Sequence, residues 1–394
     1  MYLHYVLLNP DYVNITINQV FTTITSRGKI GWSKDGEAGG LGFAYNGDNL
    51  LYEGGLMVGT SSTAVSDCIR GTSSTGASDT DFVTVVTAHK VTPPRVSEFD
   101  VNGEFNDADA TPVQNLLVRH NAYAWSSPGS SKFVIVEYII HNAGTSTLSN
   151  LYAGIFADWD VDAATASSNK SNYDATRKLG YTWATPSTSH LYAGIQLLTN
   201  TPPNFYAIDN VGAGVGGVDI ASSAGFKKAD KYTTLSTQRL QAGDSTTAGN
   251  DVCNVMSSGP FTLAANDSVK IAFALIAGDS LGDLQTSADT AYIRYNGTPI
   301  PLGISKVGVQ NFVVYPNPAA NVLNFTFSST ETENYSVSLI NMLGETVKTM
   351  TTSVPSNSSQ KISFDVSDLA TGAYMYKVIG TSGKSNTGKI SVTH

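Results

Sequence analysis

The sequence predicts an all-β protein: a large β-sandwich-like domain with one or two short helices, followed by a seven-stranded, immunoglobulin-like β-sandwich. Three observations predict this fold class. Short apolar runs with strand alternation recur along the whole chain, and clusters of Gly, Asn, Ser and Thr separate them. Charged residues make up only 14% of the chain, against about 25% in a typical globular domain. The 41% of hydrophobic residues can form folded cores, which argues against disorder.

Residues 1–296 are expected to form the larger β-rich domain, as one body or as two subdomains. The run 132–140 is almost continuously apolar, which is typical of a strand buried in the middle of a sheet. Helical spacing of apolar residues predicts a helix at 280–293, with Ser280 as its N-cap, and a shorter helix is expected at 225–232. Further strands are expected at 12–17, 115–119, 151–156, 190–195 and 269–274.

Residues 297–311 are expected to be a linker, because the two prolines and the later glycines of this segment suit neither a helix nor a central strand. A second domain follows at 312–394. Its short strands alternate with turn residues, and this pattern predicts a β-sandwich. The seven strands are expected near 312–315, 322–328, 335–341, 346–351, 360–364, 373–379 and 387–392.

Four short motifs follow one another in this second domain. A rigid Pro-Asn-Pro turn separates two strands, a Gly turn separates the next two, a Gly-Ala-Tyr segment opens another strand, and an alternating apolar strand ends the chain. The residues of these motifs are Pro316, Asn317, Pro318, Gly344, Gly372, Tyr374, Lys389, Ile390 and Val392. Their order and spacing over about residues 308–394 resemble the C-terminal sorting domain of proteins exported by the type IX secretion system.

This resemblance implies export across the outer membrane of a Gram-negative bacterium. The implied location is the outer-membrane surface or the medium, and the implied partners are the translocon and the attachment machinery of that system. Gly344, Gly372 and Tyr374 are expected to shape turns and fill the core. The final strand, 389–394, is the expected contact surface, because an edge strand at a chain end can pair with another protein.

Within residues 30–295, five stretches are similar to the β-rich accessory region that follows subtilase domains in type IX cargo. These stretches are 42–47, 51–57, 66–70, 155–160 and 205–209. The resemblance implies a non-catalytic module. The first residues carry no signal-peptide pattern, so we expect the chain to be a fragment of a longer product. One alternative is therefore the C-terminal part of a subtilisin-like serine protease without its catalytic domain.

Two other functions stay open. The stretch around Ser61 is similar to a subtilase nucleophile segment, but no histidine of the chain has the sequence context of that family, so Ser61 is not expected to be catalytic. An active hydrolase would need a different, unrecognised site. A carbohydrate-binding or adhesive surface module is the other alternative, with Trp125, Trp159 and Trp183 as candidate contacts. Glycans and surface proteins are the ligands that this alternative would take.

Charge excludes one class of partner. The net charge is −9 and the sequence has no basic run, whereas nucleic-acid binding needs a basic surface to offset the phosphates. No apolar stretch is long enough to cross a membrane as a helix.

Acidic residues and the two cysteines predict two further features, a candidate calcium site and a disulfide. Asp158, Asp160 and Asp162 alternate at strand spacing, so a calcium ion held between their carboxylates is one interpretation. A solvated loop, or pairing with Arg177 and Lys178, is the other. The segment 100–109 is a second acidic stretch, more typical of a polar turn.

Cys68 and Cys253 are an even pair in a low-charge chain, and a disulfide between them is expected.

Overall fold

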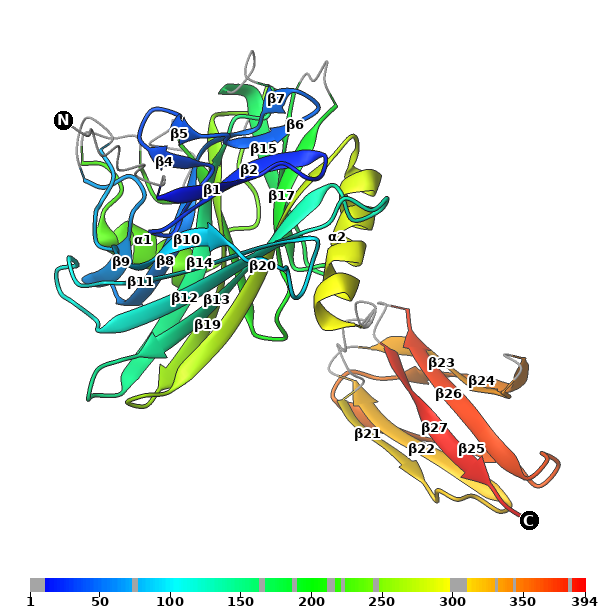
Figure 1. Ribbon diagram of the computed structural model, residues 1–394. Helices are drawn as coiled ribbons and strands as arrows, with labels where there is room; N and C mark the ends of the chain where they lie inside the picture. Colours follow the sequence, from blue (N-terminus) through cyan, green and yellow to red (C-terminus); the bar gives the residue numbers. More distant parts are fainter. Residues whose placement is uncertain are drawn as a thin grey trace, which may run out of the picture. The chain divides into compact units, whose positions relative to one another are not determined.

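A computed structural model describes residues 11–72, 77–162, 167–185, 190–210, 217–220, 224–243, 248–297, 310–329, 332–342, 345–381 and 385–394. The chain divides into two compact units, Met1–Ile300 and Pro301–His394 (Figure 1). Both consist mainly of strands, so the all-β prediction is confirmed. The predicted linker 297–311 lies largely outside the described residues.

A ten-stranded sheet forms one layer of the first unit. Its strands follow the order β18-β19-β14-β8-β3-β2-β6-β7, with β1 pairing to β2 and β9 pairing to β8. The strands are β1 (Tyr12–Ile15), β2 (Val20–Thr25), β3 (Lys29–Ile30), β6 (Phe43–Tyr45), β7 (Asp48–Asn49), β8 (Leu51–Ser61), β9 (Ala64–Asp67), β14 (Leu148–Trp159), β18 (Pro203–Asp209) and β19 (Val252–Leu263). A separate hairpin joins β4 (Trp32–Lys34) to β5 (Ala38–Gly40).

An eight-stranded antiparallel sheet forms the other layer, in the order β10-β11-β12-β13-β20-β17-β16-β15. Its strands are β10 (Val83–Lys90), β11 (Phe99–Asn106), β12 (Leu116–Ala124), β13 (Phe133–Asn142), β15 (Asn169–Asp174), β16 (Leu179–Ala184), β17 (Tyr192–Leu197) and β20 (Ser268–Gly278). The prediction that the apolar run 132–140 is a central strand is confirmed, because β13 lies in the middle of this sheet.

Strand alternation divides the apolar side chains between an inner core and two outer ones. Along β13, Val134 and Val136 belong to the core shared by the two sheets, whereas Phe133 and Ile135 belong to a cluster that also contains residues of helix α2 (Leu281–Asn296). Helix α1 (Lys228–Ser236) contributes to a third cluster, together with strands of the ten-stranded sheet. The unit is therefore a sandwich with a helix packed on the outer face of each sheet (Figure 1).

Both helices occur near their predicted positions. Ser280 caps α2, since its hydroxyl accepts a hydrogen bond from the backbone N–H of Asp283, as the sequence predicts. Helix α1 begins three residues later than the expected 225–232 segment. Its fully buried residues include a lysine, Lys231, which a pattern of apolar residues does not identify.

The second unit is a sandwich of two small antiparallel sheets, ordered β21-β22-β25 and β24-β23-β26-β27. All seven strands fall on the predicted segments: β21 (Gln310–Tyr315), β22 (Val322–Ser329), β23 (Glu333–Ile340), β24 (Thr346–Val354), β25 (Ser358–Asp365), β26 (Gly372–Gly380) and β27 (Ser385–Val392). Aromatic and aliphatic side chains of both sheets form one core, in which Phe325, Phe327 and Val392 are fully buried.

Candidate functional site

The first and last sequence motifs of the second unit are in direct contact, although they are 72 to 74 residues apart. The side chain of Asn317 donates from Nδ2 to the carbonyl oxygen of Lys389 at 3.3 Å. Its Oδ1 accepts from the backbone N–H of Ser391 at 2.9 Å. Asparagine suits this position because its amide carries a donor and an acceptor that imitate a neighbouring strand. Asn317 therefore holds the end of β27 in place.

The backbone of residue 319 extends this contact. The N–H of Ala319 donates to the carbonyl of Ser391 at 2.8 Å, and the N–H of Thr393 donates to the carbonyl of Ala319 at 2.9 Å. Strand β27 is indeed the edge of its sheet. The expectation that 389–394 offers a free edge is nevertheless wrong, because the segment after the Pro-Asn-Pro turn already pairs with it.

The other motif residues shape the same end of the sandwich. Tyr374 is buried and donates from its hydroxyl to the carbonyl of Ala370 at 2.8 Å, which closes the turn before β26. Ile390 and Val392 are both buried in the core, whereas Lys389 is exposed. Gly372 is exposed in an open position, and Gly344 lies outside the described residues.

Gly388, which precedes Lys389, has a steric explanation. It pairs across the strands with Tyr376, and a Cβ at this position would lie 2.4 Å from the hydroxyl oxygen of Tyr376. The tyrosine ring thus covers the glycine, an arrangement that offsets the poor strand-forming tendency of glycine.

Residues 313–393 match the family model of the secretion system C-terminal sorting domain. The C-terminal unit is a sorting domain of this family. The motif resemblance over about 308–394 is thereby confirmed, and the chain is cargo of the type IX secretion system. None of the described helices is long and apolar enough to cross a membrane.

Solved structures give weaker similarities. A DUF3244 family protein with an immunoglobulin-like β-sandwich fold from Bacteroides vulgatus is 17% identical, with a TM-score of 0.18, over 21% of this chain and 83% of that one. Latent dimeric PorU from Porphyromonas gingivalis is 12% identical, with a TM-score of 0.19, over 84% of this chain and 31% of that one. A polysaccharide lyase is 9% identical, with a TM-score of 0.27, over 74% and 35%. The chain spans about a third of the last two proteins. Similarity at this level gives no information on function, and no curated protein matches the chain.

We predict that Asn317→Ala loosens the last strand of the sorting domain. Two hydrogen bonds of about 0.5–1.5 kcal/mol each are lost, so the domain should be destabilised by about 1–2 kcal/mol. Amide hydrogen exchange of Ser391 should speed up, because its N–H loses its acceptor. Asn324→Ala, which removes one side-chain bond to Ser363 on another strand, serves as control and should leave Ser391 protected. Unchanged exchange of Ser391 in Asn317→Ala would contradict the role of the asparagine.

In the N-terminal unit, the predicted calcium ligand Asp158 has other partners. It lies at the end of β14, is 3% exposed, and pairs with the guanidinium of Arg70. Its other oxygen accepts from the thiol of Cys253 at 3.1 Å. Burial would lower the pKa of Arg70, but the charge of Asp158, with that of Glu53, raises it above its usual range. Asp158 thus belongs to a buried ion-pair network.

The spacing argument for three aligned carboxylates fails beyond Asp158, because β14 ends at Trp159. Asp160 is partly buried, and Asp162 has a left-handed backbone with φ of 62°. Burial, with the nearby carboxylates of Asp158 and Asp251, raises the pKa of Asp160 to about 7. Burial, with Asp158, also raises the pKa of Asp251 to about 6. Calcium binding by Asp158, Asp160 and Asp162 stays a prediction.

The predicted disulfide between Cys68 and Cys253 is absent, because both are free, buried thiols. Cys68 belongs to the core between the two sheets, whereas Cys253 belongs to the cluster under helix α1. The two side chains lie on opposite faces of the ten-stranded sheet, so its backbone separates them. Burial raises the pKa of Cys68 to about 12 and also raises that of Cys253, which keeps both as unreactive thiols.

We predict that the N-terminal unit loses stability as the pH rises from about 4 to about 7. The folded form of Asp160 keeps a proton that the unfolded form, with an ordinary pKa of about 3.9, has already released. Raising the pH through this window therefore favours unfolding. The loss should be on the order of 1 kcal/mol, since Asp160 is partly solvated and its charge is screened. Thermal unfolding of wild type and Asp160→Asn across this window measures it, and Asp160→Asn should be less sensitive to pH.

Calcium is tested in the same experiment. A bound ion would stabilise the fold by about 2.7 kcal/mol at a hundredfold excess over Kd, and it should remove the pH-dependent loss in wild type but not in Asp160→Asn. Asp109→Asn, in the exposed part of the second acidic stretch, is the matched control and should respond as wild type does. Wild-type melting that is indifferent to calcium would contradict the metal site.

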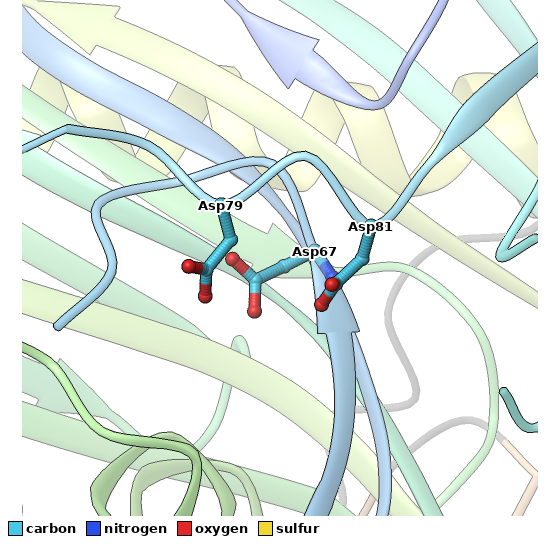
Figure 2. A group of neighbouring side chains, drawn as sticks. All are labelled: Asp67, Asp79 and Asp81. Carbon is cyan, nitrogen blue, oxygen red and sulfur yellow. The ribbon is translucent and has the colours of Figure 1, made fainter. Parts of the chain in front are cut away.

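Three other carboxylate side chains lie close together in the structure, and the sequence did not predict this cluster. Among the described residues, the acidic groups that approach closely enough to share one cation are Asp67, Asp79 and Asp81 (Figure 2). The ammonium of Lys231 on α1 occupies this position instead: its Nζ lies 2.7 Å from Asp67 and 2.9 Å from Asp79. Burial raises the pKa of Asp67 to about 6 despite the lysine. The alternation of Asp79 and Asp81 was the local signal, but Lys231 is 152 residues away from Asp79.

Proposed function

We propose that the protein works outside the outer membrane as a non-catalytic β-rich module, which the sorting domain delivers and the attachment machinery retains at the cell surface. The observation that carries this proposal is the sorting-domain match at residues 313–393, on a unit with its own closed core. Descent of the N-terminal unit from the accessory region of a subtilisin-like protease stays a prediction from sequence resemblance.

Export is tested with a reporter fused to residues 308–394 and preceded by a signal peptide, in a type IX-competent host. The reporter should appear on the surface or in the medium. Retention in the periplasm, with the fusion intact and folded, would contradict the proposal. The same fusion in a host without a working type IX translocon is the control and should stay periplasmic.

The arrangement of Ser and His side chains supports a non-catalytic module. Ser61 ends β8, and its hydroxyl contacts Thr63 at 3.2 Å. Ser268 contacts His141 Nδ1 at 3.0 Å, beside a surface hollow of about 220 Å³. These last two residues face each other on the paired strands β13 and β20, so their side chains project from a regular sheet ladder.

Turnover assays separate this proposal from an active hydrolase. The purified chain should cleave neither casein nor peptide libraries. Ser268→Ala provides the matched control: activity that is present in wild type and lost in Ser268→Ala would overturn the non-catalytic assignment and locate the nucleophile.

A pair of stacked, partly exposed aromatic rings favours carbohydrate binding as a second candidate. Trp183 on β16 stacks on Tyr192 of β17, with ring centroids 6.1 Å apart and planes 16° apart. Tyr181 packs against both rings from a buried position, with its ring centroid 5.6 Å from that of Trp183 and 6.4 Å from that of Tyr192. Trp183 and Tyr192 are partly exposed, whereas Trp125 and Trp159 are buried and are excluded as glycan contacts. Flat aromatic surfaces combine large contact area with little side-chain entropy, which suits the apolar faces of sugar rings.

We predict that any glycan captured on an array loses at least tenfold in affinity with Trp183→Ala. Removing the indole ring breaks the stacked pair, and tenfold corresponds to about 1.4 kcal/mol, a typical contribution of one stacked aromatic ring. Trp183→Phe should keep most of the binding because it retains a flat ring. A glycan that binds both variants as it binds wild type would place the binding surface elsewhere.

A further inference from the structure

The contact between helix α1 and strand β9 contains a lysine and an aspartate that are both removed from solvent. The side chains of Lys231 and Asp67 are each 0% exposed. Nζ of Lys231 lies 2.7 Å from Oδ1 of Asp67. The surrounding cluster includes Ile69, Phe156 and Leu235, and the ring of Phe226 lies 5.5 Å from Nζ. The Lys231 and Asp67 side chains are therefore held in contact, out of solvent, between an apolar cluster and the carboxylates of Asp79 and Asp81.

We propose that Lys231 and Asp67 are joined by an amide bond between Nζ and Cγ, an intramolecular cross-link between the helix and the ten-stranded sheet. A proton passes from the ammonium to the carboxylate, which gives a neutral amine and a neutral acid. The nitrogen lone pair then attacks Cγ, the bond from Cγ to one carboxyl oxygen breaks, and this oxygen leaves as water. The amide nitrogen keeps one hydrogen and the water takes the other two, so atoms and charge balance without an oxidant or a co-reactant.

Burial favours the products of this reaction. Two charges are costly in an apolar pocket unless all their hydrogen bonds are made. Asp67 does not meet this condition, because its Oδ2 has no hydrogen-bond partner within the described structure. The amide replaces both charges by one neutral group. Groups held in contact react as if present at effective concentrations of about 10⁵–10⁸ M when well oriented, so the fold supplies the proximity and orientation that an amine and an acid lack in water.

A third group is placed to move the protons. Asp79 accepts from the same Nζ at 2.9 Å, and its carboxylate oxygens lie beside those of Asp67 (Figure 2). It can take a proton from the attacking nitrogen and return it to the leaving oxygen, the role of a general acid–base. The side chain of Asp79 is 28% exposed, so it also lies where the released water can leave. Asp79 itself is not consumed.

Mass spectrometry of the full-length, denatured protein tests the proposal directly. The wild-type mass should be lower than the sequence mass by one water molecule. Digestion should yield one branched peptide that contains both Asp67 and Lys231. Full sequence mass in wild type would overturn the proposal, and so would a branch at Asp79 or Asp81 instead of Asp67. These outcomes need no variant.

Three variants locate the chemistry. Lys231→Arg keeps a cation for the carboxylates but has no amine to acylate, so its mass should equal the sequence mass. Asp79→Asn keeps both reacting groups and should leave most of the chains uncross-linked. Lys228→Arg is the matched control on the same helix, since Lys228 faces Asp81 at 3.4 Å and is partly exposed, and it should retain the full mass deficit. A deficit that persists in Lys231→Arg would overturn the assignment.

Discussion

Deleting residues 389–394 is expected to abolish export and to unfold the sorting domain. Ile390 and Val392 are 2% and 0% exposed in its core, and the deleted residues provide four of the eight residue pairs between β27 and β26. Burying one such side chain contributes about 1.5–3 kcal/mol, so the two together contribute about 3–6 kcal/mol. Entire domains are stable by only about 5–15 kcal/mol. The deletion therefore removes a large part of the stability that the domain has.

Two measurements separate export from folding. Cell fractionation should find the truncated chain in the periplasm, and calorimetry of the purified chain should show the transition of the N-terminal unit without that of the sorting domain. Deleting only Thr393 and His394, which are exposed, is the matched control and should leave both transitions. Normal export of the six-residue deletion would show that the last strand is not required for sorting.

If the last strand only carried a sorting signal, the rest of the domain would fold without it. The positions of the sequence motifs suggest such a separate signal, because the motifs lie at the two ends of the domain. In the structure, Asn317 and Ala319 bind the backbone of Ser391, so the two ends form one surface. We therefore expect recognition by the translocon to depend on the folded state of the domain, so that a variant that loosens either end weakens sorting.

Local patterns predicted the elements of this protein well. The seven strands of the sorting domain and the cap of α2 depend on alternation, turn residues and a single Ser hydroxyl, which neighbouring residues determine. Contacts between residues that are far apart in the sequence could not be predicted from these local patterns. Which face of the ten-stranded sheet Cys68 occupies depends on strand order and on register shifts in β8 and β14, and neither is written in the spacing of the residues.

The charged residues illustrate the same limit. Asp158, Asp160 and Asp162 stand out because they are close in sequence, yet the partner of Asp158 is Arg70, 88 residues away. Asp67 and Lys231 are separated by 164 residues and look ordinary one at a time. Buried ion pairs arise where distant segments meet, so their chemistry becomes visible only when the fold brings them together.

Arg70→Met is expected to destabilise the N-terminal unit by about 3–5 kcal/mol, the usual cost of leaving a buried charge without its partner. Arg70 is the shared cation of two carboxylates: Nε lies 2.7 Å from Glu53, and Nη2 contacts Asp158. The side chains of these three residues are 14%, 11% and 4% exposed. Met fills a similar volume, so the loss reports the charge and not a cavity.

The matched control for this variant is Arg119→Met on the eight-stranded sheet. Arg119 also pairs with a glutamate, Glu104 at 3.1 Å, but its side chain is 60% exposed, and such surface pairs contribute only about 0–1 kcal/mol. Denaturant unfolding of both variants should therefore separate them by several kcal/mol. Equal losses in the two variants would contradict the view that burial makes the Arg70 pair costly to break.

A triple variant identifies the cause of the loss. Adding Glu53→Gln and Asp158→Asn to Arg70→Met removes the two orphaned charges while keeping the shapes of their side chains. Much of the stability should return, because a buried ion pair replaced on both sides is often close to neutral. If the triple variant were as unstable as Arg70→Met alone, the contribution of Arg70 would lie in its contacts with the rings of Tyr52 and Phe156 and not in its charge.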